Sequence, residues 1–319
     1  MTWRLLFAFL LFAATDGAEA QAPVRTPVKI GIITDAMVPW HDATQGFRDG
    51  LKDEGLIEGK DIILDARPTR GDPDRVLAIY DELRAQKSDL LVCVADTCKK
   101  ENGLIPMVFL QIDPLPRGLV RNIARPEGNI TGVSDLRAEM TAKRLELFRE
   151  LLPSLKRVLV SYDPRETGEV QSVASARSAA SSLGLTLIEQ PITDRFDIEP
   201  GLTSLQGGGS DGILIVQAGT NLNIPGRSFE VAFARKIPTM YMNTLWGEVG
   251  ALATYGPDVY VQGRQAARMA HKIVMGVRPA DIPVEQAERF VFTLNLKTAK
   301  HLGLSIPPQS LVRADRIIE

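Results

Sequence analysis

The stretch VKIGIIT at Val28–Thr34 decides the fold class of this chain of 319 residues. Its apolar residues follow one another almost without interruption, which is typical of a strand buried on both faces. A helix pattern at Gln45–Glu54 comes next and ends at Gly55. Because strands buried on both faces occur in parallel sheets covered by helices, this first unit predicts an α/β fold.

The same alternation of strand and helix continues along the chain and then starts again. The first series has further strands at Asp61–Ala66, Asp89–Ala95 and Ile105–Ile112 and a helix at Asp74–Ala85. The second series has helices at Glu139–Leu152, Val170–Leu183, Ile198–Leu205 and Phe229–Arg235 and strands at Arg157–Tyr162, Leu185–Glu189, Gly212–Gln217 and Pro238–Met242. Two such series predict two doubly wound parallel-sheet lobes.

The carboxyl-terminal part of the chain contains too few elements for a third domain. It has a strand pattern at Gly250–Tyr255, a long helix at Asp258–Met275 and a strand at Phe290–Leu294. One helix and two strands cannot bury a core alone, so they must join the two lobes. We expect residues 28–130 plus 257–283 in lobe 1 and residues 134–253 plus 290–319 in lobe 2, with a cleft between the lobes.

The first twenty residues, MTWRLLFAFLLFAATDGAEA, have the layout of a secretory signal peptide. Arg4 precedes an apolar run at Leu5–Ala14, and the segment ends in the small-x-small site Ala18-Glu19-Ala20. The alternative is a buried N-terminal helix. The apolar run is too short to span a bilayer, which needs about 20 apolar residues. We expect residues 1–20 to be removed, the mature chain to start at Gln21 and, without a cysteine there, a soluble periplasmic protein rather than a lipoprotein.

Composition and charge narrow the classes of partner. Hydrophobic residues make up 45% of the chain and charged residues 24%, as in ordinary globular proteins. The signal segment holds one basic and two acidic residues, so its removal changes the formal net charge of −2 to about −1. A nearly neutral chain without a basic run gives no electrostatic case for nucleic acid. No second apolar stretch of spanning length exists, so we expect no stable membrane insertion, and we expect a monomer.

The two cysteines, Cys93 and Cys98, have a C-x4-C spacing. This spacing fits neither a redox C-x-x-C motif nor a zinc site. An oxidising compartment permits a disulfide, which requires Cα atoms within about 7 Å of each other. Because Cys93 lies in an apolar strand pattern and Cys98 just beyond it, we expect two buried thiols rather than a disulfide.

Ligands of open parallel sheets bind beyond the carboxyl ends of the strands. The candidate ligand-binding residues at these ends are Asp35, Trp40, Asp96, Thr97 and Asp113 in lobe 1 and Ser134, Asp135, Gln217, Thr220, Asn243 and Trp246 in lobe 2. The two tryptophans are either aromatic walls that close on a ligand or ordinary loop packing. The aspartates are either partners for a ligand amine or N-caps, the expectation for Asp72 and Asp163.

Catalytic motifs are missing. His41, His271 and His301 are scattered, and none has metal-ligand spacing with another histidine or a glutamate. The chain has no Gly-x-Ser-x-Gly, no P-loop and no Gly-x-Gly-x-x-Gly. We therefore expect no catalytic residue, no metal and no cofactor.

Four groups of short motifs carry a family resemblance. They are Phe47–Gly55 with Glu58-Gly59-Lys60, Ala124–Gly132, Tyr255-Gly256-Pro257-Asp258, and Asn295–Lys300 with Gly303-Leu304 and Ile306-Pro307-Pro308. Together they resemble the ABC-transporter substrate-binding protein family that includes tryptophan- and tyrosine-binding members. The resemblance covers nearly the whole mature chain. It implies a type I periplasmic-binding-protein fold with three hinge crossings, and an importer partner made of a permease and an ATPase.

One segment departs from the family pattern. Members commonly carry a Gly-Thr-Pro-type turn and an Ala-rich helix after the third strand, whereas this chain has the shorter, charged segment Ala95–Leu104. The ligand of the aromatic-amino-acid binders is therefore not carried over. We expect a solute-binding component that captures a small organic ligand, amino-acid-like or aromatic, for an importer. The alternatives are a sensor module that presents the ligand to a membrane receptor and an exported α/β enzyme, which the missing nucleophile and base disfavour.

Overall fold

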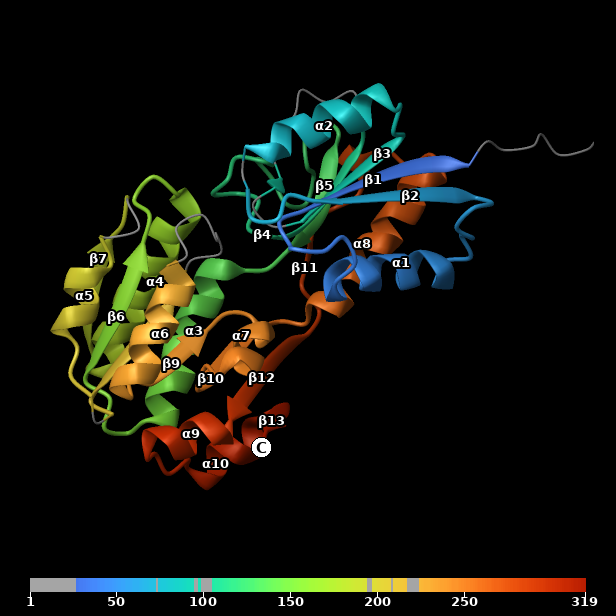
Figure 1. The fold of residues 1–319 in the computed structure, drawn as a ribbon. Coiled ribbons are helices and arrows are strands. Elements are labelled where there is room, and N and C mark those ends of the chain that lie inside the picture. The colour runs from blue at the N-terminus through green and yellow to red at the C-terminus, as the bar shows by residue number, and fades with distance from the viewer. Residues whose placement is uncertain are drawn as a thin grey trace, which may run out of the picture.

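The computed structural model describes residues 27–72, 74–94, 97–98, 105–193, 197–207, 209–216 and 224–319. They form two α/β bodies that lie next to each other and are joined by short chain segments, as Figure 1 shows. Each body is built on one sheet, which confirms the predicted fold class. The predicted signal segment lies outside the described residues.

The sheet of lobe 1 is parallel throughout and has the strand order β11-β5-β4-β3-β1-β2. Its strands are β1 (Val28–Thr34), β2 (Ile62–Pro68), β3 (Leu90–Val94), β4 (Met107–Ile112), β5 (Ile130–Ser134) and β11 (Glu285–Gln286). Helices α1 (Asp42–Asp53) and α8 (Val259–Val274) cover one face, and α2 (Arg75–Ala85) covers the other. The continuous apolar run of β1 is explained by these two layers, which bury both of its faces.

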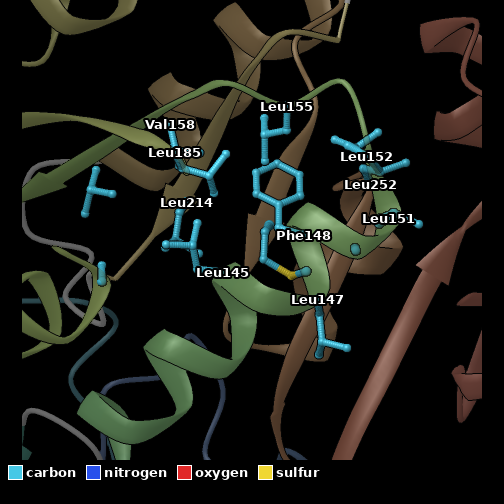
Figure 2. Close-up of a cluster of buried hydrophobic side chains, with 14 of the residues drawn as sticks. Leu145, Leu147, Phe148, Leu151, Leu152, Leu155, Val158, Leu185, Leu214 and Leu252 are labelled. Carbon is cyan, nitrogen blue, oxygen red and sulfur yellow. The ribbon is translucent and has the colours of Figure 1, made fainter. Parts of the chain in front are cut away.

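The sheet of lobe 2 has the order β13-β12-β10-β9-β8-β6-β7. Its strands are β6 (Arg157–Tyr162), β7 (Thr186–Pro191), β8 (Asp211–Ile215), β9 (Thr239–Tyr241), β10 (Ala253–Pro257), β12 (Phe290–Asn295) and β13 (Arg316–Ile318). Its helices are α3 (Arg137–Leu151), α4 (Thr167–Leu183), α5 (Glu199–Ser204), α6 (Ile224–Arg235), α7 (Thr244–Val249), α9 (Leu296–Leu302) and α10 (Pro308–Arg313). Figure 2 shows the core around Phe148, where side chains of α3 pack on the sheet.

Two strands, β12 and its parallel neighbour β13, correct the expectation of a wholly parallel second sheet. β12 runs antiparallel to β10, with Phe290 opposite Pro257. The direction of β12 follows from the place where the chain enters lobe 2. The chain comes back from lobe 1 at the end of the sheet where the parallel strands finish, so a strand that starts there must run in the opposite direction.

Helices α1 and α8 approach each other closely because small residues line their contact. A Cβ atom on Gly46 would lie 2.1 Å from the carbonyl oxygen of Tyr260, and one on Gly263 would lie 2.1 Å from that of Ala43. Glycine removes the atoms that would keep these backbones apart. This contact holds α8, which lies far away in the sequence, in the layer of α1.

The chain crosses between the two bodies three times, from β5 to α3, from β10 to α8 and from β11 to β12. The backbone N–H of Asp258 in the second crossing donates to the carbonyl oxygen of Arg289 in the third at 2.9 Å. The N–H of Ala287 donates to the carbonyl oxygen of Ser134 at 2.9 Å. The strand β5 was not predicted, and it places Ser134 in the first sheet, whereas the sequence assigned Ser134 and Asp135 to lobe 2.

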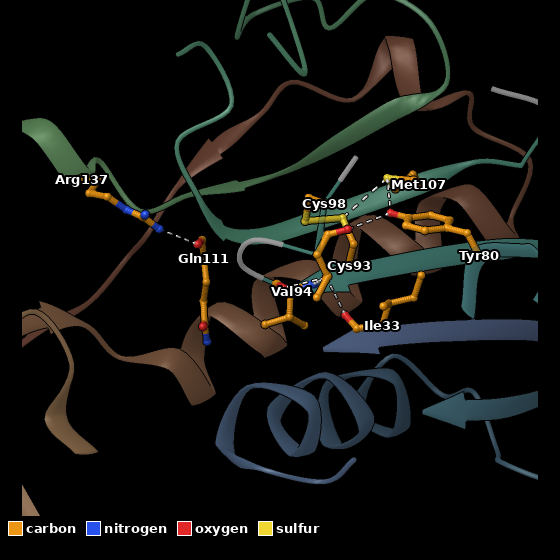
Figure 3. The surroundings of a disulfide bond; sticks show 9 residues. Ile33, Tyr80, Cys93, Val94, Cys98, Met107, Gln111 and Arg137 are labelled. Carbon is orange, nitrogen blue, oxygen red and sulfur yellow. Dashed lines mark hydrogen bonds between the residues drawn. A yellow bond between two sulfur atoms is a disulfide. The ribbon is translucent and has the colours of Figure 1, made fainter. Parts of the chain in front are cut away.

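The expectation of two buried thiols is wrong. Cys93 in β3 and Cys98 form a disulfide, and their Cα atoms are 5.1 Å apart (Figure 3). Thr97 lies against β3, and its hydroxyl donates to the carbonyl oxygen of Val94 at 2.8 Å. The neighbouring Cys98 is thus within bridging distance of Cys93.

Most other predicted elements are present with shifted ends. The strand predicted at Gly250–Tyr255 begins at Ala253, and the one predicted at Gly212–Gln217 is β8. The short elements α7, α9, α10, β11 and β13 have no counterpart in the prediction. In the part of the chain that the structure describes, no helix is long and apolar enough to cross a membrane.

Candidate functional site

The loop after β1 is organised by Thr34, the last residue of the strand. Its hydroxyl shares a hydrogen bond of 2.8 Å with Nε2 of His41, and the hydroxyl of Thr44 accepts from the N–H of His41 at 2.9 Å. Burial lowers the pKa of His41, although the carboxylate of Asp42 acts in the opposite direction. The loop between these residues carries two of the predicted site residues, Asp35 and Trp40, and both are half-buried.

The two tryptophans are each packed in their own lobe. Trp40 packs against the core of lobe 1, and the guanidinium carbon of Arg48 lies 4.9 Å from its ring centroid. Trp246 stacks on Tyr241 with ring centroids 4.8 Å apart. Both rings remain half-buried, so each has packing partners and an accessible side. That they face each other across a ligand stays a prediction.

Two further predicted residues use their side chains to shape the backbone. Asn243 caps α7, and its side-chain oxygen accepts from the N–H of Leu245 at 2.9 Å. The hydroxyl of Thr97 is buried and is hydrogen-bonded to β1 and β3, at 3.1 Å from the carbonyl oxygen of Ile33. The structure thus gives both a positioning role at the strand ends.

The end of β4 and the end of β5 bring Asp113 and Asp135 together. Ile112 and Ser134 are register partners in these neighbouring parallel strands, and the two aspartates are the next residues of each. Ser134 is buried, and its hydroxyl accepts from the N–H of Leu136 at 3.3 Å. The carboxylates therefore leave the sheet next to each other at the first crossing.

Arg137, which sequence reasoning missed, holds one side of this pair. Its guanidinium lies 3.2 Å from Oδ2 of Asp135 and donates to the carbonyl oxygen of Gln111 at 3.1 Å (Figure 3). Both side chains of the ion pair are buried. Gln111 and Leu136 have positive φ angles of 59° and 51°, in the left-handed region that non-glycine residues rarely adopt. The signal for this ion pair in the sequence was the position of Arg137, two residues after Asp135.

The surroundings of Asp113 raise the pKa of its carboxyl group. Its pKa rises to about 6, first because burial disfavours the charged form and then because Asp135 and Glu139 add negative charge. The guanidinium of Arg137 acts in the opposite direction. Asp113 thus has Asp135 and Glu139 as acidic neighbours and Arg137 as a basic one, and the buried guanidinium of Arg144 also interacts with Asp135.

The remaining predicted residues, Asp96, Gln217 and Thr220, lie outside the described residues. No group of three or more His, Cys, Asp or Glu side chains within the described ranges is arranged to hold a metal ion. The described residues offer hydrogen-bond acceptors, two aromatic rings and negative charge at the ends of strands from both sheets.

Comparison with known proteins gives a family and several relatives. Residues 29–318 match the family model described as ABC transporter substrate binding protein. A tyrosine-binding protein of Clostridioides difficile is 27% identical over 269 residues, which is 82% of this chain and 76% of that protein.

Two solved structures share the fold closely. A conserved domain protein from Vibrio cholerae has a TM-score of 0.81 and 27% identity, with 92% of this chain and 100% of that one covered. An ABC domain in complex with L-Trp from Streptococcus pneumoniae has a TM-score of 0.81 and 24% identity, with the same coverage.

Proposed function

Because the chain belongs to the ABC transporter substrate binding protein family, we propose that it captures a small organic ligand between its two lobes and delivers it to the permease of an importer that an ATPase drives. The ligand contacts both lobes and stabilises a closed form through bending at the three crossings. Binding favours closure only if the closed form binds the ligand more tightly than the open form does. The protein recognises its ligand and makes or breaks no bond.

The observation that carries this proposal is the position of two carboxylates at a crossing. Asp113 and Asp135 follow neighbouring strands of the first sheet, and the chain passes to the second sheet beside them, so a ligand held there acts on a segment that bends. Trp246 follows a strand of the second sheet. Exposed apolar side chains of Met37 and Leu245 lie beyond strand ends of lobe 1 and lobe 2 and suit the apolar part of an organic ligand.

An amino-acid-like or aromatic ligand is the class that this site favours. Aromatic rings and exposed apolar side chains match a carbon skeleton, and carboxylates match a polar or charged group. Two relatives in the comparison are a tyrosine-binding protein and a domain in complex with L-Trp, which supports the same class.

The place of action in the proposal is the periplasm. It follows from the signal-peptide layout of residues 1–20 and from the family, whose function requires contact with a membrane-bound permease. Mass spectrometry of the exported protein tests it: an N-terminus at Gln21 supports export by cleavage, and an intact Met1 on that material contradicts it.

Ligand binding itself is tested with a thermal-shift panel of amino acids, aromatic acids, organic acids and sugars. A cognate ligand raises the melting temperature by mass action, and titration calorimetry then gives Kd. Trp40→Ala and Trp246→Ala should each weaken binding by roughly tenfold or more, since a lost aromatic wall exceeds about 1.4 kcal/mol. Native affinity in both folded variants would make the rings packing residues.

The importer role is tested by partner capture. The ligand-loaded protein should retain a permease and its ATPase from solubilised membranes. Retention of a membrane receptor in their place would favour the sensor module, and turnover of the bound compound would favour an enzyme.

A further inference from the structure

Asp135 has a buried oxygen atom that the described part of the chain leaves without a partner. The residue is 6% exposed, and Arg137 occupies only Oδ2, so Oδ1 has no hydrogen-bond partner among the described residues. A buried carboxylate oxygen that has lost water and gained no donor is unfavourable. Such an atom calls for a donor from outside the protein.

Gln262 of α8 is a second buried side chain of this kind. It is 1% exposed, and within the part of the chain that the structure describes neither its amide oxygen nor its amide nitrogen has a partner. It lies one turn before Ala266 on the stripe of α8 that faces the first sheet, where Ala266 and Met269 pack in the same cluster as Val133. A polar residue in that apolar stripe has no packing explanation.

The register of α8 places Gln262 at the level of Asp135. Nε2 of Gln265 donates to the carbonyl oxygen of Gln286 at 3.0 Å, and Gln286 pairs with Ser134 in the sheet. β11 runs parallel to β5 and therefore points toward the crossing. α8 precedes β11 in the chain and runs away from the crossing, so α8 starts at the carboxyl ends of the strands. Three residues of helix span about 4.5 Å and one residue of strand about 3.3 Å. Gln262 thus stands level with the residue after Ser134.

Strand alternation puts the two aspartates on the side of α8. Ile130 packs on the α2 side of the sheet and Val133 on the α8 side, so Asp135 continues the side of Val133. Ile112 packs on the α2 side after the bulge in β4, so Asp113 also turns toward α8. The three polar side chains therefore gather at one end of one face.

We propose that Asp113, Asp135 and Gln262 bind the protonated primary amine of the ligand, which makes the ligand an amino acid or another primary amine. An ammonium group donates three N–H bonds, and its positive charge complements the two carboxylates. Oδ1 of Asp135, a carboxylate oxygen of Asp113 and the amide oxygen of Gln262 accept them. This inference rests on the proposed function and names the chemical class of its ligand.

The test uses matched compounds that differ only in the charged groups. The probes are L-tryptophan, indole-3-propionate and tryptamine, the corresponding series for L-tyrosine and L-leucine, and sugars and dicarboxylates without an amine. Each is screened by thermal shift and then titrated by calorimetry. We expect at least one amine-bearing member to bind and its des-amino partner to bind at least tenfold more weakly.

Variants assign the effect to the site. Asp113→Asn, Asp135→Asn and Gln262→Met should each weaken binding of the amine-bearing probe at least tenfold. The control is Asp163→Asn, because Asp163 also follows a strand but both of its oxygens accept hydrogen bonds from Arg165. Circular dichroism confirms that each variant is folded, and Gln262→Met leaves the Asp135–Arg137 pair intact.

The outcomes separate this inference from the proposed function. Binding of des-amino acids, sugars or dicarboxylates with no preference for an amine overturns the amine site and leaves solute binding intact. Unchanged affinity in folded Asp113 and Gln262 variants also overturns it. Failure of every amine-bearing probe overturns the amine site, and failure of every compound in the panel counts against solute binding as well.

Discussion

The Nε–H of Arg144 donates a hydrogen bond of 2.8 Å to the carbonyl oxygen of Tyr255, which joins α3 to β10. Arg144 is 1% exposed, and burial lowers its pKa to about 10. Because α3 follows the first crossing and β10 precedes the second, this bond fixes the two chain segments on the side of lobe 2. If the lobes bend at the crossings as we propose, we expect the bending at residues nearer lobe 1, among them Leu136 with its positive φ angle.

Arg144→Lys should lower the free energy of unfolding by about 1.5–3 kcal/mol, because lysine cannot reproduce the fixed guanidinium contact with a buried carbonyl. Urea denaturation of both proteins measures this difference. Arg84→Lys serves as the control, since Arg84 is exposed and pairs with Asp81, and its effect should stay within about 0.5 kcal/mol. Equal stability of the two variants would contradict the structural role of Arg144.

Asp113→Asn should make the ligand-free protein more stable than the wild type at pH 7 to 8. The pKa of Asp113 is raised from 3.8 to about 6, so the folded protein binds this proton more tightly than the unfolded chain does. The stability that the proton contributes is fully present below pH 3.8 and is lost as the pH rises through about 6. The advantage of the variant should therefore shrink from pH 7 toward pH 4, as urea titrations at several pH values can follow. A constant advantage would contradict the raised pKa.

Gly46→Ala should destabilise lobe 1 by more than about 2 kcal/mol, because its methyl group would meet the backbone of α8. Gly168→Ala is the matched control. Gly168 is also helical, and a Cβ atom there has no neighbour within 4 Å. That variant should be as stable as the wild type or more stable by up to about 1 kcal/mol. Thermal unfolding compares the two, and similar melting temperatures would refute the close α1–α8 contact.

The Cys93–Cys98 bridge should be detectable by mass spectrometry. Protein unfolded in guanidinium without a reductant should not react with iodoacetamide, and after reduction it should gain two adducts, one for each cysteine. Replacing both residues, Cys93→Ala with Cys98→Ala, should cost about 2 kcal/mol, as expected for closure of a short loop. Two adducts before reduction would show that the thiols are free.

The sequence predicted β1 and most of the other strands and helices well, because periodicity and strand length depend on residues that are close together in the chain. It also placed Asp113 at the end of a strand for the same reason. It missed β5, whose residues lie in a stretch without a following helix in lobe 1, and it missed the short elements α7 and β13.

What the sequence by itself determined is the α/β class and the position of each polar residue along its own element, since both follow from local patterning. The tertiary structure alone decided which of those residues meet. Cys93 and Cys98 met in a disulfide, and the entry point of the chain reversed β12. The packing of α8 against β11 and β5 put Gln262 near the carboxyl ends of the first sheet's strands, and this position depends on segments more than a hundred residues apart in the chain.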